Sequence, residues 1–366
     1  MHVALLIMLV AVGGAAPHNR TLQNRTLLLI LPDDYTAPAI NAYAQTAAAL
    51  ASSETAAFNL ITITSGNTPM RTFARVLDAF RGANISGIIG PPDSSEAVVL
   101  AAWASEVGVP VVSYSATAPS LGSAADYPNF LRVVADDGAT LDAAVALLCN
   151  VNASRAAFLA QNDDFGVQGM STFSAAAAAA GVAVLYTGTF AHDNCSLASI
   201  PVLNKAIASG ARYFLLWAFP ACSDAVMLAA AQLGAVGPAY VWVLASETNL
   251  TGLPASNRQF DGTLVVEAAT YEYAPFADPT LRNAMQSALE DGYRAILRQP
   301  TTVYAPYAAD AVFIVAAALD TLPLSWGGGL QQCLRFDRVM EAGTLNALMS
   351  RVRVWDSDSS VRKQRA

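Results

Sequence analysis

The sequence predicts a doubly wound α/β protein with two lobes. Short continuous apolar runs alternate with longer alanine-rich stretches along the 366 residues, and this pattern is typical of strands separated by helices. Strands that are apolar on both faces need helices on each side of a mostly parallel sheet. A single hydrophobic core stops growing at about 250–300 residues, so this chain length favours two lobes.

The first predicted elements follow one another closely. Strands are predicted over Thr26–Leu31, Phe58–Ile63 and Ile85–Gly90. Helices are predicted between them, over Ala39–Ala51 and Thr68–Ala83, because both stretches contain many good helix formers. This order is that of strands joined by crossover helices in a parallel sheet.

The alternation continues along the chain. Further strands are predicted at Val109–Ser113, Arg155–Ala160, Val182–Phe190, Tyr213–Trp217 and Tyr240–Leu244. The run Ala175–Ala180 precedes Gly181 and a strand, which predicts a packed helix because alanine favours helices and glycine ends them.

Composition excludes two classes of protein. Hydrophobic residues make up 54% of the chain and charged residues 13%, which is typical of a globular protein and not of a disordered one. The formal net charge is −8, and lysine occurs only at Lys205 and Lys363. A nucleic-acid partner is not expected, because there is no basic stripe to neutralise phosphates.

The N-terminus predicts the secretory pathway. The apolar run Ala4–Val12 is followed by Gly14 and Ala16, which stand where a signal peptidase needs small residues, so residues 1–16 are interpreted as a signal peptide. The alternative is an apolar first strand. The chain also holds six N-x-S/T sequons, which are typical of a glycosylated secreted surface: Asn19, Asn24, Asn84, Asn152, Asn194 and Asn249.

Membrane anchoring is not expected from the rest of the chain. After the signal, no stretch approaches the roughly 20 apolar residues that cross a bilayer. The last residues, 355–366, are a polar tail. We therefore expect a secreted protein, or one on the extracellular face of a membrane, with no transmembrane helix after the signal peptide.

Two hydroxyl-rich segments follow neighbouring predicted strands. Ligands of doubly wound sheets bind outside the carboxyl ends of the strands. Ser94 and Ser95 come after the third strand and begin a helix, whose free amides can hold a carboxylate. Ser115 and Thr117 follow the fourth strand. The serines either cap the helix only or line a ligand site together with the second segment.

Several motifs together resemble the receptor family ligand-binding region, which is similar to bacterial periplasmic amino-acid-binding proteins. Their order and spacing agree over roughly residues 26–325. The motifs are Ile88–Pro91 with Ser94–Ser95, Val109–Thr117, Tyr127–Phe130, Arg132–Asp137, Asp163–Gly169 and Tyr307–Phe313.

The resemblance implies a clamshell of the type I periplasmic binding protein kind, in which two doubly wound parallel-sheet lobes are joined by a hinge. By analogy, lobe 1 comprises residues 25–133 and 271–354, and lobe 2 comprises residues 134–270. Cys149, Cys195, Cys222 and Cys333 permit three pairings. We expect one disulfide within lobe 2.

The resemblance also implies the ligand-binding residues. In amino-acid-binding members, the hydroxyls after the third and fourth strands hold the ligand's α-carboxylate and amine. Here those residues are Ser94, Ser95, Ser115 and Thr117.

Four further residues stand at family ligand positions. Asp137 matches an acidic position near the hinge, and Glu247 takes the place of an aspartate that faces the ligand's ammonium group. Phe165 stands where many members have tyrosine, and its ring face could still contact a cation. Tyr304 replaces the lysine of glutamate-binding members, so glutamate is not the expected ligand.

The end of the chain departs from the family pattern. The sequence stops soon after Val352–Val354, where members continue into a further part of lobe 2, so a truncated or shortened lobe 2 is expected. Linker, membrane and signalling modules are also absent, so signal transduction by this receptor ectodomain would need a separate membrane subunit.

The expected function is therefore that of an extracellular receptor domain that closes on a small amino-acid-like ligand. The alternative is a ligand-free module of the same fold that dimerises or binds a protein partner. The apolar faces of Ala39–Ala51 and Val98–Val107 either form a lobe 1 homodimer interface or simply cover the sheet.

Catalysis is not expected. His192 is the only histidine in the body of the chain and lies in a polar segment. A dinucleotide fingerprint, a phosphate-binding loop and a metal-ligand set are all missing from the sequence, so no cofactor and no metal is expected. The adjacent acids Asp163 and Asp164 are interpreted as solvated surface.

Overall fold

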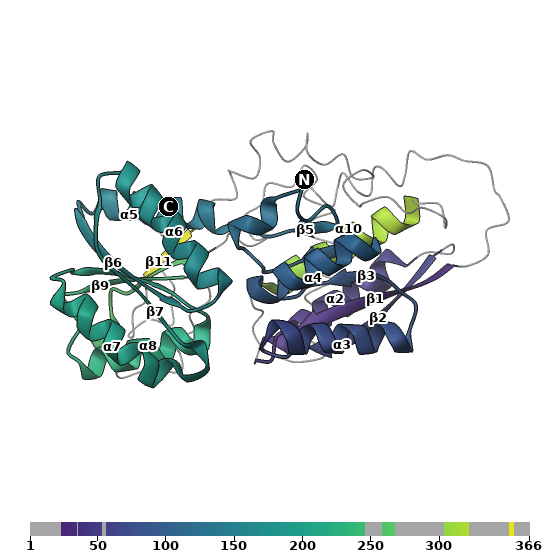
Figure 1. The fold of residues 1–366 in the computed structure, drawn as a ribbon, viewed down its shortest axis with the longest axis horizontal. Coiled ribbons are helices and arrows are strands. Elements are labelled where there is room, and N and C mark those ends of the chain that lie inside the picture. The colour runs from purple at the N-terminus through teal and green to yellow at the C-terminus, as the bar shows by residue number, and fades with distance from the viewer. Residues whose placement is uncertain are drawn as a thin grey trace. The chain divides into compact units, whose positions relative to one another are not determined.

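The computed structural model describes residues 23–34, 36–52, 56–245, 258–267, 304–321 and 351–354 (Figure 1). The chain divides into two compact units. Unit 1 contains the described residues up to 134 together with the helix at 304–321, and unit 2 contains the other described residues.

Unit 1 is built on a parallel sheet of five strands in the order β2-β1-β3-β4-β5. The strands are β1 (Gln23–Leu31), β2 (Ala56–Thr64), β3 (Ile85–Ile89), β4 (Val111–Ser113) and β5 (Phe130–Arg132). The helices are α2 (Ala37–Ala51), α3 (Pro69–Gly82), α4 (Ser94–Val107) and α10 (Tyr304–Thr321), with a short 3₁₀ turn, η1 (Pro119–Gly122). The order reverses direction between β1 and β3, which makes their carboxyl ends the topological switch point of the sheet.

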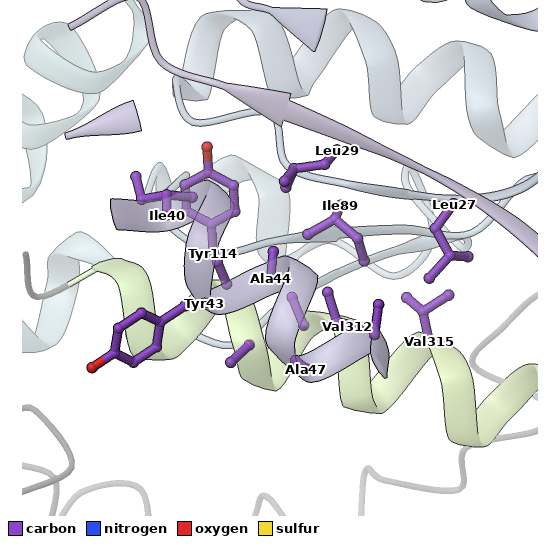
Figure 2. Close-up of a cluster of buried hydrophobic side chains, with 14 of the residues drawn as sticks. Leu27, Leu29, Ile40, Tyr43, Ala44, Ala47, Ile89, Tyr114, Val312 and Val315 are labelled. Carbon is purple, nitrogen blue, oxygen red and sulfur yellow. The ribbon is translucent and has the colours of Figure 1, made fainter. Parts of the chain in front are cut away.

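Alternate residues of β1 enter two different cores. Leu27 and Leu29 pack with α2 and α10 on one face of the sheet (Figure 2). Leu28 and Ile30 pack with α3 and α4 on the other face. All four side chains are fully buried, and this explains why β1 is apolar without alternation.

Helix α10 comes far later in the sequence than the strands it covers. Figure 2 shows Val312 of this helix beside Ala47 of α2, and Val315 beside Leu27 of β1. The close approach of α10 to β3 requires glycine at Gly87, because a Cβ there would lie 2.9 Å from a methyl group of Val315.

Unit 2 repeats the same plan. Its sheet has the order β11-β10-β9-β8-β6-β7, with five parallel strands and an antiparallel β11. The strands are β6 (Arg155–Gln161), β7 (Ala183–Phe190), β8 (Tyr213–Trp217), β9 (Val241–Leu244), β10 (Leu264–Glu267) and β11 (Arg351–Val354). The helices are α5 (Asp137–Asn150), α6 (Asp164–Ala179), α7 (Cys195–Ala208) and α8 (Pro220–Gln232).

The unit 2 sheet also separates two cores. Phe158 and Leu215 pack with α5 and α6, while Leu159 and Leu216 pack with α7 and α8. The switch point of this sheet lies between β6 and β8. The predicted fold class, two parallel-sheet α/β units, is therefore confirmed.

The expected disulfide within the second lobe is confirmed. Cys195 at the start of α7 is bonded to Cys222 in α8, with a Cα–Cα distance of 5.2 Å. Cys149 is exposed and not in a disulfide, and Cys333 lies outside the described residues.

One boundary differs from the expectation. The sequence analysis assigns residues up to 354 to lobe 1, but β11 pairs with β10 in the unit 2 sheet, with Leu264 opposite Val354. A strand of four residues carries too little pattern to reveal its partner, which is chosen by tertiary pairing. The predicted signal peptide and polar tail lie outside the described residues.

Candidate functional site

Two loops of unit 1 meet at the carboxyl edge of its sheet. The first loop runs from Gly90 to Asp93 between β3 and α4, and the second follows β4 from Tyr114 to Ala118. Because β3 and β4 are parallel neighbours, both loops leave the sheet at the same edge, beside the switch point.

Hydrogen bonds join these two loops. The Ser113 hydroxyl donates to the Pro91 carbonyl at 2.7 Å, and the Ser115 hydroxyl donates to the Pro92 carbonyl at 2.9 Å. The Ser113 oxygen also accepts from the Ala116 amide at 2.9 Å. The shape of the edge is therefore set by serine side chains as well as by the sheet.

Gly90 allows the backbone to turn at this edge. Its φ angle is +100°, and a Cβ at this position would lie 3.0 Å from the Ile30 carbonyl oxygen. Tyr114 fills the space beside it, with its hydroxyl donating to the same carbonyl at 2.7 Å. A side chain at position 90 would crowd the Ile30 carbonyl and disturb its hydrogen bond with Tyr114.

Ser94 is the first residue of α4, and its side chain is 2% exposed. Its hydroxyl oxygen accepts hydrogen bonds from the Thr117 amide at 3.2 Å and from the Ala118 amide at 3.1 Å. Ser94 therefore fixes the second loop against the start of α4. In this role Ser94 bonds to a neighbouring loop and not to the amides of its own helix.

Ser95 and Thr117 are half-exposed residues at the same place. Within the described part of the chain, neither side-chain hydroxyl has a hydrogen-bond partner. The side chain of the N-cap residue Asp93 makes no capping hydrogen bond to α4. The first amides of a helix point outward without intrahelical partners, so this turn offers N–H and O–H donors side by side.

Glu96, in the same turn, is a buried acid that the sequence analysis did not single out. Its Oε1 accepts from the Ser65 hydroxyl at 2.6 Å and from the Thr72 hydroxyl at 2.7 Å. Burial raises the pKa of Glu96, and the two hydroxyl hydrogen bonds and the charge of Arg75 oppose that rise. Its spacing from Asp93 is that of a capping box, which is the one sequence signal that could have drawn attention to it.

Three acidic residues act on the hydroxyl of Tyr114 at the switch point. Burial is the main cause that raises the pKa of Tyr114 well above its usual value, and the charges of Asp93, Asp34 and Glu96 raise it further. These acids come from the segments after β1 and β3. The edge therefore combines hydroxyl and amide donors with nearby carboxyl groups.

In unit 2, Phe165 lies in the first turn of α6 at the carboxyl end of β6. Its ring is 8% exposed and stacks on Trp217 and Phe219, with centroid distances of 5.4 and 5.2 Å. These neighbours take up ring surface that the resemblance assigns to a ligand cation.

A polar bridge crosses the switch point of unit 2. The Gln161 side-chain oxygen accepts from the Phe219 amide at 2.7 Å, and the Gln161 amide group donates to Asp163. Asp163 caps α6 by accepting from the Gly166 amide at 2.9 Å. Burial is the main cause that raises the pKa of Asp163, and these hydrogen bonds lower it in part.

The other predicted site residues lie on different elements. Asp137 is the first residue of α5 and is 2% exposed. Tyr304 begins α10 and packs, half-buried, against the core that includes Leu27. Glu247 lies outside the described residues. The structure thus groups Ser94, Ser95, Ser115 and Thr117 in unit 1. Asp137 and Phe165 lie in unit 2, and Tyr304 begins a helix of unit 1.

The described residues hold no group of three or more His, Cys, Asp or Glu side chains that could bind a metal. His192 is exposed in a short 3₁₀ turn, as expected. The described helices include none long and apolar enough to span a bilayer.

The fold is that of the type I periplasmic binding proteins. Solved structures with this fold include an ABC transporter substrate-binding protein from Desulfitobacterium hafniense, with a TM-score of 0.67 and 16% identity over 94% of this chain and 100% of that chain. The same type of protein in complex with Leu has a TM-score of 0.68, again with 16% identity and the same coverage of both chains.

The chain belongs to the receptor family ligand-binding region, whose family model matches residues 46–361. Among its relatives is Glutamate receptor 3.1 of Oryza sativa subsp. japonica, 27% identical over 247 residues, which are 66% of this chain and 26% of that protein. Taste receptor type 1 member 3 of Mus musculus is 36% identical over 104 residues, 28% of this chain and 12% of the receptor. The chain thus spans about a quarter or less of these relatives, and the resemblance seen in the sequence is confirmed.

Proposed function

We propose that this chain is an extracellular receptor-type domain that binds a small amino-acid-like ligand and closes on it. The observation that carries the proposal is the first turn of α4 beside the loop after β4. There the hydroxyls of Ser95 and Thr117 are not engaged by other described residues, next to the outward-facing amides of a helix N-terminus. Such donors suit a carboxylate.

The charges of the same edge support an ammonium group as the second feature of the ligand. Asp93 and Asp34 act on the Tyr114 hydroxyl at the switch point. A molecule that carries both a carboxylate and an ammonium group would match donors and acids within one edge. Binding of Leu by a structural neighbour agrees with this ligand class.

In this proposal, unit 1 corresponds to the lobe that receives the ligand first. Ser94 and Ser115 shape the site through their internal hydrogen bonds, while Ser95 and Thr117 contact the ligand. Unit 2 then contributes Phe165 and Glu247, with Asp137 near the hinge, so that the ligand stabilises the closed state through contacts made only there. The lobes would follow residues 25–133 and 134–270, with Tyr304 on the returning segment of the first.

The proposal includes secretion, with residues 1–16 as a signal peptide, and signalling through a separate membrane subunit. Catalysis is not part of it, because the family and fold are of the ligand-binding type and the site offers donors without a nucleophile and base pair.

Thermal melting of the secreted chain with each of the twenty standard amino acids tests the proposal. A ligand specific for the native state raises the melting temperature by linkage. The shift should be lost in the double variant Ser95→Ala/Thr117→Ala and kept in Ser105→Ala, a matched change at the other end of α4. Cooperative melting without any shift would favour the alternative, a ligand-free dimerisation or partner-binding module.

A further inference from the structure

The buried acid of α4 connects three elements of unit 1. Ser65 follows β2, Thr72 lies in α3 and Glu96 lies in the first turn of α4. Both hydroxyls donate to the same carboxyl oxygen, at 2.6 and 2.7 Å. The three side chains are between 1% and 2% exposed. The cluster is therefore an internal junction and not a surface patch.

Glu96 also decides which way the two hydroxyls point. Because each gives its proton to Oε1, its oxygen is left to accept from the backbone. The Ser65 oxygen accepts from the Asn67 amide at 3.1 Å, and the Thr72 oxygen accepts from the Gly66 amide at 2.7 Å. A single acceptor thus orients both hydroxyls that hold the backbone of this loop.

Glu96 does not cap its own helix. A glutamate three residues after the N-cap usually turns back and accepts from the N-cap amide. Here Oε1 is taken by Ser65 and Thr72, and Oε2 is buried with no hydrogen-bond partner among the described residues. Glu96 therefore ties the turn to the loop after β2 and to α3, and does not occupy the hydroxyl of Ser95.

Ser94 also holds the first turn of α4, because its hydroxyl oxygen accepts from the amides of Thr117 and Ala118. Ser94 and Glu96 are two residues apart and bind loops that follow different strands. The first turn of α4 is thus tied to the loop after β2 and to the loop after β4.

Resting on the proposed function, we propose that Glu96 is a positioning residue for the ligand site of unit 1. It makes no contact with the ligand. It holds the turn that carries Ser94 and Ser95 at a constant place relative to the loop after β2, so that helix amides and hydroxyls need no ordering when a carboxylate arrives. Preorganisation of this kind increases affinity by lowering the cost of binding.

Two substitutions of Glu96 distinguish its hydrogen-bonding role from its negative charge. Glu96→Gln keeps an acceptor oxygen for Ser65 and Thr72. Glu96→Leu removes the acceptor and leaves two buried hydroxyls without one. Glu106→Leu, at the exposed end of the same helix, is the matched control. Ile85→Ala, at the amino edge of the sheet, controls for general loss of stability in unit 1.

The first measurement is hydrogen exchange without added compound. Glu96→Leu should speed exchange at the amides of residues 65–67 and 94–97, and Glu96→Gln should restore slow exchange. The second is calorimetric titration with each of the twenty standard amino acids. Glu96→Leu should raise the dissociation constant of any amino acid that binds by about tenfold or more, because part of the binding free energy is then spent on ordering the turn.

The outcomes distinguish the two proposals. If the wild-type protein binds none of the twenty compounds, the proposed function fails, and the ligand role of Glu96 fails with it. If the wild-type protein binds one of them and Glu96→Leu binds it equally well, or if Ile85→Ala weakens binding as much, only the positioning role is overturned. Should Glu96→Leu not fold, Ser65→Ala removes one donor and is judged by the same two measurements.

Discussion

Ser94 and Thr117 are 23 residues apart in the sequence, yet the Thr117 amide donates to the Ser94 hydroxyl oxygen at 3.2 Å. The parallel pairing of β3 with β4 brings their following loops together. The bond links a residue that shapes the edge with one whose own hydroxyl is not engaged by other described residues.

Ser94→Ala should destabilise unit 1. The amides of Thr117 and Ala118 would lose their acceptor, at a cost of about 1–3 kcal/mol in the free energy of unfolding. Urea unfolding of the two proteins measures this difference. Ser105→Ala is the control, because the Ser105 hydroxyl only adds a bond to the helix carbonyl of Ala101. Equal losses in the two variants would contradict the role given to Ser94.

Gly90→Ala should cost more than Gly108→Ala. Both glycines have positive φ, which costs other residues about 1–2 kcal/mol. A Cβ at Gly90 would also crowd the backbone carbonyl and the Cβ of Ile30, whereas a Cβ at Gly108 would meet open space. Chemical denaturation of both variants tests the order, and an equal cost would show that the edge around Gly90 can relax.

Asp224, in α8, should make the stability of unit 2 depend on pH. Burial raises the pKa of this half-buried carboxyl from 3.8 to about 7. Between these two pH values the native state keeps its proton, whereas the unfolded chain has lost it. Its contribution to stability is therefore complete below about pH 4 and is lost as the pH rises through about 7.

Melting temperatures between pH 4 and 8 check this expectation. The wild-type protein should lose stability relative to Asp224→Asn as the pH rises, because asparagine stays neutral. Asp142→Asn replaces an exposed acid of α5 and should not alter the profile. Parallel profiles for wild type and Asp224→Asn would refute the assignment.

Passage through a eukaryotic secretory pathway should attach glycans to Asn84, Asn152 and Asn194. All three are exposed, and Asn84 and Asn152 shortly precede β3 and β6, at the amino edges of the sheets opposite the candidate site. Mass spectrometry before and after peptide N-glycosidase treatment should show one glycan fewer for each Asn→Gln change. Asn59→Gln, outside any sequon, serves as the control. A secreted protein with no mass change would exclude this modification.

Much of the fold could be predicted because the central strands are buried on both faces. β1, β6 and β8 are apolar runs, and the sequence predicts each within a few residues. β5, β10 and β11 were not predicted, because each has only three or four residues and lies outside a longer apolar run. The pairing of β11 with β10 is a contact between distant segments, which no local pattern contains.

The class of fold, the two polar segments after β3 and β4, and their meeting at one edge of a parallel sheet can be read from the sequence. They follow from local periodicity and from the direction of parallel strands. The folded structure is needed to see that the hydroxyls of Ser94 and Ser113 are used inside the protein, whereas those of Ser95 and Thr117 are not engaged by other described residues. The reason is physical: a hydroxyl's partners come from loops that are neighbours in space, and the packing of Ser65, Thr72 and Glu96 depends on three elements at once.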